Sequence, residues 1–345
     1  MNPTTSGLLI SVILPARNAG DTLEACVESV LASDHPPLEV LVVDDASVDE
    51  TPGIVARLTR EHPDRVFGFR LPSPRGPATA RNHGARHARG EALFFLDSDT
   101  VLLPGSLGVF AEALGGCDAV TGTYDAEALN PGWVPAYKAL FDHYCFTRRG
   151  KVPLRVFSAA VAGLWAEVFG EVGGFDESLR WGMDYEGEEF GERLTQSHLN
   201  LLVPGVVARH RFPRLGRLTC LYFRRAAQWA ELFLWRTGFD TGAHKTLGTA
   251  LATLSPALAL LALPLALFCP ALRGLPIFFL ATWLVGHLGF FRFVARRRPG
   301  LLGVALGLNL YLALVLSVGA GVGLGKALAE RIRPDPGSWK RRPQR

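Results

Sequence analysis

The sequence predicts an α/β fold with a parallel sheet at the front of the chain and a separate apolar region behind it. In the first hundred residues, short runs of β-branched and other apolar residues alternate with segments of helical period. Such alternation is typical of parallel β-α-β units, whose helices cover both faces of the sheet. Beyond about Phe239 apolar residues dominate, and 48% of the whole 345-residue chain is hydrophobic. We therefore expect two parts with different surroundings.

The first hundred residues are expected to run strand, helix, strand, helix, strand, helix, strand. Each expected strand is a short apolar run, and each expected helix places apolar residues three or four positions apart. The first helix has a candidate capping box, with Asp21 as N-cap and Glu24 three residues later. The seven segments are residues 8–14, 21–32, 38–43, 51–60, 66–71, 79–89 and 91–96, and a strand at 119–124 and helices at 166–172 and 186–196 are expected beyond them.

The rear of the chain has the pattern of a membrane region. Residues 217–239 mix aromatic, aliphatic and arginine side chains, which is typical of a helix lying in the membrane interface, although a surface helix of a soluble domain shares this pattern. Three apolar stretches without a polar face follow, and each approaches or exceeds the roughly 20 residues that cross a bilayer. They are residues 247–272, 275–294 and 301–324. The expected organisation is a front domain at 1–216, an amphipathic helix and linker at 217–245, a transmembrane region at 246–326 and a basic tail at 327–345.

The basic residues point to a membrane and not to nucleic acid. The net charge is only +4, and basic residues gather at 292–298 and 326–345, where they do not interleave with aromatics on a soluble face. Basic flanks of apolar segments suit an anionic membrane surface. With the front domain in the cytoplasm, two crossings would return 292–298 to the cytoplasm, as the positive-inside rule requires. A third crossing would export the basic tail, so either one stretch is re-entrant or the tail breaks the rule.

The expected location is therefore the cell membrane, crossed more than once, with the front domain on the cytoplasmic side. Five cysteines are scattered without paired spacing, which favours a reducing compartment for the front domain. The N-terminus runs directly into a strand and has no signal-peptide pattern.

Two carboxylates one residue apart, Asp97 and Asp99, end the fourth expected strand. Ligands of parallel α/β sheets bind at the carboxyl ends of the strands. Residues at spacing two point to the same side of an extended backbone, about 6–7 Å apart, so these two acids would repel each other unless a positive group lies between them. Hard divalent cations prefer carboxylate oxygens and share substrate phosphates. The pair therefore predicts Mg²⁺ or Mn²⁺ bound together with a diphosphate; the alternative is a solvated turn.

Other polar residues fall on the same expected edge. Asp44 and Asp45 end the second strand, where a carboxylate can accept hydrogen bonds from a base ring or ribose, and Ser47 could cap the next helix. Arg81 and Asn82 open a helix after a Gly-Pro turn, and a guanidinium beside a helix N-terminus suits a diphosphate. An isolated arginine at this position could equally be a surface residue.

Four sequence blocks, in order, resemble the family-2 glycosyltransferases of GT-A fold: SVILPARNAGDTLEACVESVL, VLVVDDASVDET, GPATARNHGARHARGEALFFLDSDT and VGGFDESL. The resemblance covers roughly residues 11–210. It implies a Rossmann-like domain that binds a nucleotide-diphosphate sugar. It also implies site residues: Pro15, Asn18, Asp44 and Asp45 on the nucleoside, Arg81, Asn82, Asp97 and Ser98 toward the diphosphate, and Asp97, Asp99 and His210 on Mg²⁺ or Mn²⁺.

On the acceptor side the family has an acidic block, which reads WGMDYEGEEFGERL here. Its alignment puts Glu186 on a family Glu, but Gly187 where an Asp usually serves as the base. A carboxylate must act as the base that deprotonates the acceptor hydroxyl as this attacks the anomeric carbon. Asp184 and Glu186 are the leading candidates, with Glu188 a third. On a helix, Glu186, Glu189 and Arg193 share a face. Glu188, Glu189 and Arg193 are therefore expected to support the site, the last two as an ion pair.

The resulting expectation is a membrane-anchored, metal-dependent, inverting glycosyltransferase. It would move a sugar to a hydroxyl or phosphate of a lipid-linked or membrane-proximal acceptor. Two alternatives stay open. A nucleotidyltransferase would need a Gly-rich basic signature near the first strand, which PARNAG lacks. A catalytically inactive membrane scaffold is favoured by Gly187.

Overall fold

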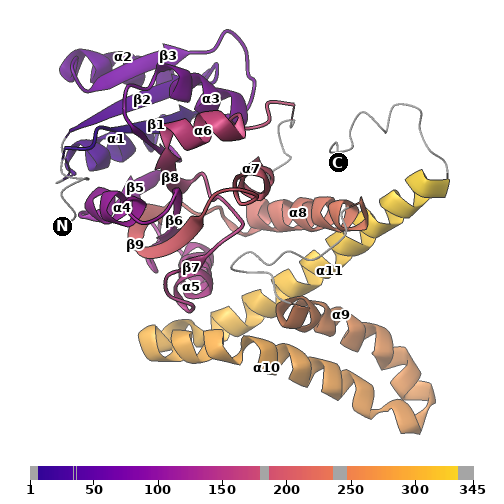
Figure 1. Cartoon of the computed structure of the whole chain (residues 1–345). Helices are drawn as coiled ribbons and strands as arrows, with labels where there is room; N and C mark the ends of the chain where they lie inside the picture. The colour runs from indigo at the N-terminus through magenta and orange to yellow at the C-terminus, as the bar shows by residue number, and fades with distance from the viewer. Residues whose placement is uncertain (1–6, 34, 36, 179–185, 236–246, 333–345) are drawn as a thin grey trace. The chain divides into compact units, whose positions relative to one another are not determined.

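The computed structural model describes residues 7–33, 35, 37–178, 186–235 and 247–332. The chain divides into two compact units, which are described one at a time (Figure 1). The first unit comprises the described residues up to Phe212 except Gly132–Tyr137. The second unit comprises Gly132–Tyr137 and the described residues from Pro213 onward.

The first unit is built on one mixed sheet, with the strand order β3-β2-β1-β4-β8-β6-β9-β5 and with β7 paired to β9. The first four strands of this order are parallel, as the sequence predicts. The next strand, β8, runs antiparallel to β4 and ends the parallel half of the sheet. The strands are β1 Ile10–Ala16, β2 Leu38–Asp44, β3 Val66–Arg70, β4 Ala92–Leu96, β5 Thr100–Leu102, β6 Ala119–Tyr124, β7 Val152–Pro153, β8 Val161–Trp165 and β9 Asn200–His210.

Helices alternate with the parallel strands as predicted. The predicted capping box is wrong: helix α1 has Thr22 as its N-cap, with no side-chain cap bond, because the turn before it closes through the carbonyl of Ala19. The Asp21 carboxylate instead accepts a 3.1 Å hydrogen bond from Arg211. The helices are α1 Leu23–Leu31, α2 Thr51–Glu61, α3 Pro77–His87, α4 Ser106–Leu114, α5 Trp133–Thr147, α6 Ala166–Val172 and α7 Glu186–Leu194.

Two hydrophobic clusters lie on the two faces of the sheet. Residues of β1 divide between them, because successive strand side chains point to opposite faces. Val12 and Leu14 pack with side chains of α1, α2 and α4, whereas Ile13 packs with side chains of α3, α6 and α7. In the second cluster Phe95 of β4 contacts the rings of Phe157, Phe169 and Phe175. This aromatic cluster brings the segment before β8, the loop after α6 and helix α7 to the end of β4.

The second unit contains the long helices α8 Leu215–Trp235, α9 Leu247–Phe268, α10 Gly274–Arg297 and α11 Leu302–Ile332. Single turns of 3₁₀ helix, Pro270–Leu272 and Pro299–Leu301, join the last three. By length and composition, Gly248–Phe268, Pro270–Arg297 and Pro299–Ala329 could each cross a membrane. They coincide with the three apolar stretches of the sequence.

Candidate active site

The loops after β1 and β2 are joined by Asn18 and Ser47. The Asn18 N–H donates to Ser47 Oγ (2.9 Å), and the Val48 N–H donates to Asn18 Oδ1 (3.0 Å). Asn18 has a positive φ of 49°, which asparagine tolerates better than most residues. Ser47 does not cap α2, whose N-cap is Glu50. These contacts hold together the chain that follows Pro15, a residue of β1 that pairs with β2.

Asp44 and Asp45 play different structural parts. Asp45 accepts hydrogen bonds from the backbone N–H groups of Arg75 (2.7 Å) and Gly76 (3.0 Å), and so shapes the loop before α3. Asp44 is 1% exposed, and its Oδ1 accepts the Ser47 N–H (2.9 Å). Its buried Oδ2 has no hydrogen-bond partner among the described residues, although Arg70 Nε lies 3.4 Å away as an ion pair. Only one oxygen of the Asp44 carboxylate is therefore engaged in a hydrogen bond within the described residues.

Arg81 links the end of β4 to the start of α7. Its Nη2 donates to Asp97 Oδ1 (2.8 Å) and its Nη1 donates to Glu186 Oε1 (3.0 Å), while its side chain is only 5% exposed. Desolvation of the partly buried carboxylate raises the pKa of Asp97 above its ordinary value although Arg81 opposes this, and the neighbouring charge of Asp99 adds to the rise. The positive group expected beside these acids is thus in part a protein side chain. Ser98, between them, is buried.

Asp99 faces His210 at the end of β9. Thr100 pairs with His210 across β5 and β9, and His210 Nε2 lies 3.3 Å from Asp99 Oδ1. The rings of Tyr124 and Phe212 lie 4.8 Å and 4.6 Å from the imidazole and fix its place. Its buried Nδ1 has no hydrogen-bond partner in the described part of the chain.

The spacing of Asp99 and His210 would suit two adjacent ligands of a divalent ion. Two neighbouring ligands of an octahedral ion with bonds of about 2.1 Å are roughly 3 Å apart, close to the 3.3 Å between Asp99 Oδ1 and His210 Nε2. Asp97 would add an oxygen other than the one bonded to Arg81. Within the described residues, no three acidic, histidine or cysteine side chains are already gathered as a metal site.

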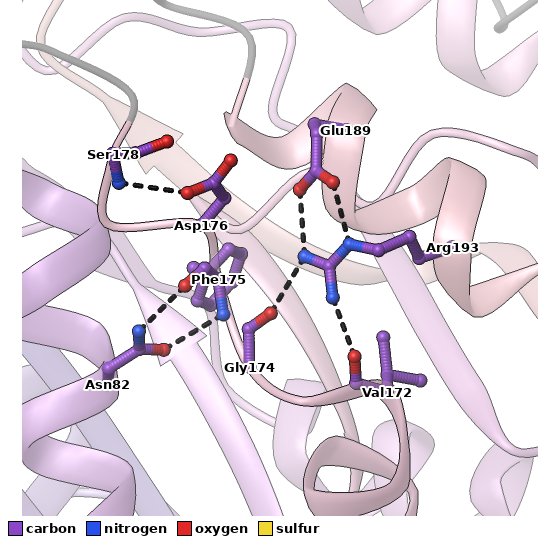
Figure 2. A network of polar contacts seen from close by, with 8 residues as sticks. All are labelled: Asn82, Val172, Gly174, Phe175, Asp176, Ser178, Glu189 and Arg193. Atoms are coloured by element: carbon purple, nitrogen blue, oxygen red, sulfur yellow. Dashed lines mark hydrogen bonds and ion pairs between the residues drawn. The ribbon is translucent and has the colours of Figure 1, made fainter. Parts of the chain in front are cut away.

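The loop Val172–Ser178 is held from two sides (Figure 2). Asn82 of α3 pairs with both backbone groups of Phe175, donating to its carbonyl (2.8 Å) and accepting its N–H (2.9 Å). Arg193 of α7 donates to the carbonyls of Val172 (2.6 Å) and Gly174 (2.8 Å) and to both oxygens of Glu189. The predicted ion pair between Glu189 and Arg193 is therefore present. The side chain of Asn82, which the resemblance places near the diphosphate, forms its hydrogen bonds to this loop.

The first turn of α7 packs against the backbone before β8. A Cβ atom at Gly187 would lie 2.4 Å from the carbonyl oxygen of Phe157, and one at Gly191 would lie 2.2 Å from that of Arg155. The Asp that the family pattern expects at 187 has no room here. Glu186 on Arg81 and the partly buried Glu188 occupy the same turn. Asp184 lies outside the described residues.

Sequence reasoning did not identify Glu177 and Thr79 as part of this region. Glu177 accepts hydrogen bonds from Asn82 (3.0 Å) and Thr79 (3.1 Å). Burial raises its pKa, but these bonds and the nearby Arg86 outweigh burial and hold the pKa below its ordinary value. The only signal in the sequence is that Glu177 belongs to the VGGFDESL block.

A mixed α/β sheet with acids at the carboxyl ends of its parallel strands, completed by an acidic helix, defines the class: a glycosyltransferase domain of GT-A fold. Residues 11–172 match the sequence profile of glycosyl transferase family 2 and form a domain of that family.

Curated relatives are similar to a little over a quarter of this chain. The succinoglycan biosynthesis protein ExoO of Rhizobium meliloti (strain 1021) is 41% identical over 99 residues, which are 28% of this chain and 27% of the relative. The GalNAc(5)-diNAcBac-PP-undecaprenol β-1,3-glucosyltransferase of Campylobacter jejuni is 37% identical over 99 residues, 28% of this chain and 32% of the relative. The UDP-Glc:α-D-GlcNAc-diphosphoundecaprenol β-1,3-glucosyltransferase WfaP of Escherichia coli is 35% identical over 91 residues, 26% and 35%. The chain thus spans about a quarter to a third of these relatives.

Among solved structures, the mannosyltransferase PcManGT from Pyrobaculum calidifontis, in complex with GDP-Man and Mn²⁺, superposes with a TM-score of 0.55 at 21% identity. The likeness covers 95% of this chain and 88% of that one. GalNAc-T7 with UDP, GalNAc and Mn²⁺ superposes with a TM-score of 0.50 at 20% identity, over 61% of this chain and 44% of that one. At these identities the likeness establishes the fold.

Proposed function

We propose that this protein is a membrane-bound, inverting glycosyltransferase that moves a sugar from a nucleotide-diphosphate sugar to a hydroxyl or phosphate of a lipid-linked acceptor. The observation that carries the proposal is the Arg81 bridge. One buried guanidinium fixes Asp97, at the donor edge of the sheet, relative to Glu186, at the start of the acidic helix. A transferase needs the leaving group and the attacking group held in one geometry, and such positioning supplies a large part of the rate enhancement.

The donor side has groups suited to a nucleoside diphosphate. The Oδ2 of Asp44, which has no hydrogen-bond partner among the described residues, could accept a ring N–H of the base or a ribose hydroxyl. Asp97, Asp99 and His210 would hold Mg²⁺ or Mn²⁺, whose charge would offset the negative charge that develops on the departing diphosphate. The manganese in the two solved GT-A structures supports this cofactor.

On the acceptor side, the acids that precede and open α7 would act as base. Attack by the acceptor oxygen on the face of the anomeric carbon opposite the leaving diphosphate inverts that carbon, and the base takes the hydroxyl proton as the bond forms. Glu186 is 19% exposed, so solvent and substrate can reach it while Arg81 keeps its carboxylate in place. Asp184, two residues earlier in the sequence, is the other candidate.

A lipid-linked acceptor is supported by two independent facts. Three helices of the second unit have the length and composition of membrane spans. Two relatives are named for acceptors that carry undecaprenol diphosphate. The cytoplasmic side is proposed for the first unit because the basic cluster at 292–298 follows two of these helices.

The test is turnover of UDP-, GDP- and dTDP-sugars by the purified full-length protein in detergent, with membrane lipid extract and with or without Mn²⁺. We expect manganese-dependent release of the nucleoside diphosphate that increases with lipid extract. Asp99→Asn should reduce it by about 100-fold or more, whereas Asp64→Asn, an exposed surface change, should not. No turnover of any donor, or full activity of Asp99→Asn, would favour the inactive scaffold instead.

A further inference from the structure

Helix α8 must begin on the same side of the membrane as the first unit. Strand β9 ends at His210 and α8 begins at Leu215. Five peptide steps span at most about 17 Å, well short of the roughly 30 Å of bilayer hydrocarbon. The linker 236–246 that follows α8 contains Asp240 and Lys245. Eleven residues could reach across about 30 Å of hydrocarbon only if they were extended, and an extended backbone cannot cross it because its polar groups would lack partners there. Since the exposed arginines of α8 keep that helix out of the hydrocarbon as well, helix α9 starts on the same side.

Helix α8 runs alongside α11 at backbone contact. A Cβ atom at Gly319 would lie 2.5 Å from the carbonyl oxygen of Phe223, and one at Gly323 would lie 2.0 Å from that of Ala227. Near the start of α8, Thr219 Oγ1 and Tyr311 OH are 3.0 Å apart. Both sets of contacts advance in the same chain direction, so the two helices run parallel. Small residues at a spacing of four permit this close approach.

The charges of α8 keep it out of the hydrocarbon. Arg217, Arg224 and Arg225 are exposed on the helix. Arginine is costly in the bilayer centre and usually faces protein or water there. If α11 crossed the membrane from Leu302, Gly323 would lie about 32 Å along it, near the far surface, and α8 would be drawn through the hydrocarbon with its arginines. The part of α11 beside α8 must therefore stay at the surface where α8 lies.

The other contacts of α11 agree with a shallow position. Ser317 Oγ lies 3.4 Å from the carbonyl oxygen of Thr253, which is only about 9 Å from the start of α9. If α11 entered the membrane beside α9 and ran parallel to the bilayer normal, Ser317 would lie about 22 Å from the start of α11, much deeper than Thr253. Figure 1 shows α9 and α10 as a packed hairpin, with α11 running across them toward α8.

We propose that α11 lies along the membrane surface on the side of the first unit, covered by α8, and that only α9 and α10 cross the bilayer. The partner of this surface is a lipid bilayer, with anionic headgroups beside the arginines of α8. The apolar side chains that α11 exposes, including Val318 (60% exposed) and Leu328 (51%), face the acyl chains. The basic tail from Lys326 then stays on the same side as the cluster at 292–298, and both obey the positive-inside rule. This inference does not depend on the catalytic proposal.

The first test is labelling by a membrane-impermeant maleimide in sealed membrane vesicles of known orientation. The background is the full-length protein with its exposed and partly exposed cysteines replaced, Cys117→Ser, Cys220→Ser and Cys269→Ser, which leaves only the buried Cys26 and Cys145. Single cysteines are added as Asp64→Cys in the first unit or Lys326→Cys on α11, both at exposed positions. We expect both to be labelled from the same side. Labelling of Lys326→Cys only from the side opposite Asp64→Cys would overturn the proposal.

The second test measures depth with nitroxides at Tyr311, Val318 and Val322, exposed positions on one face of α11. A surface helix should give nearly equal depths in the leaflet of the first unit. A spanning helix would give depths that differ by up to about 16 Å. Gly323→Leu should separate α8 from α11 and lower the melting temperature, while Gly325→Leu, with open space around it, should not. Equal melting temperatures of these two variants would contradict the contact between α8 and α11, on which the proposal rests.

Discussion

Restoring a side chain at Gly187 should damage the protein, although the family pattern expects an Asp there. An added Cβ would lie 2.4 Å from the Phe157 carbonyl oxygen, so the first turn of α7 must move by nearly 1 Å. Overpacking of this kind costs about 1–3 kcal/mol. The displacement would also weaken the 3.2 Å hydrogen bond from the Phe157 N–H to the Gly187 carbonyl, worth about 1 kcal/mol. The higher helix propensity of Ala returns at most about 1 kcal/mol.

The assay is thermal unfolding of the full-length protein in detergent, with Gly187→Ala compared with Gly170→Ala. Gly170 lies in α6 with no atom within 4 Å of its would-be Cβ, so its replacement should be neutral or stabilise by about 0.5–1 kcal/mol. Gly187→Ala should lose about 1–3 kcal/mol, which lowers Tm by about 2–4 °C per kcal/mol in a unit of this size. A Tm of Gly187→Ala equal to or above that of Gly170→Ala would refute the close packing of α7.

Two further substitutions test the charges of the first unit. Arg81→Met leaves Asp97 and Glu186 without their shared cation. We expect a loss of at most about 3–5 kcal/mol in the free energy of unfolding, reduced because Asp97 is a third exposed, and a roughly 100-fold loss of sugar transfer. Unchanged turnover would contradict the bridging role of Arg81. Burial raises the pKa of Glu39, but hydrogen bonds from Ser11 and Arg89 outweigh it and keep the pKa below 4.5. The ionised Glu39 therefore stabilises the folded protein above about pH 4.5, and this stabilisation is lost as the pH falls further. Glu39→Gln should flatten the dependence of Tm on pH below about pH 4.5. An unchanged dependence would contradict this role of Glu39.

Much of the fold follows from local pattern. The alternation of short apolar runs and helical segments predicts β1 to β4 and their helices, because strand and helix periods are imposed by buried faces that each segment carries alone. β6 and α6 coincide with their predicted ranges of residues 119–124 and 166–172. The capping box is absent because the turn before α1 closes through the Ala19 carbonyl with Thr22 as N-cap, and Asp21 pairs instead with Arg211, 190 residues away in the chain. A local sequence pattern gives no information about a partner so distant in the chain.

The site shows the same division. The sequence placed Asp97 and Asp99 at the end of a strand, but only the folded chain gives them different partners, Arg81 and His210. The resemblance assigned Asn82 to the diphosphate, whereas its amide pairs with the backbone of Phe175. Only the folded chain shows which backbone group lies within reach of this amide, and a contact of Asn82 with a diphosphate stays a prediction.

The class of the protein could be predicted from local properties of the chain: the strand and helix periods, the acids that end the strands, and the apolar length of the rear helices. Only the folded structure shows which charged side chains pair, which backbone atoms leave no room for a side chain at residue 187, and that α8 packs against α11. These outcomes depend on distances of a few ångströms between segments far apart in the chain, and sequence spacing does not encode such distances.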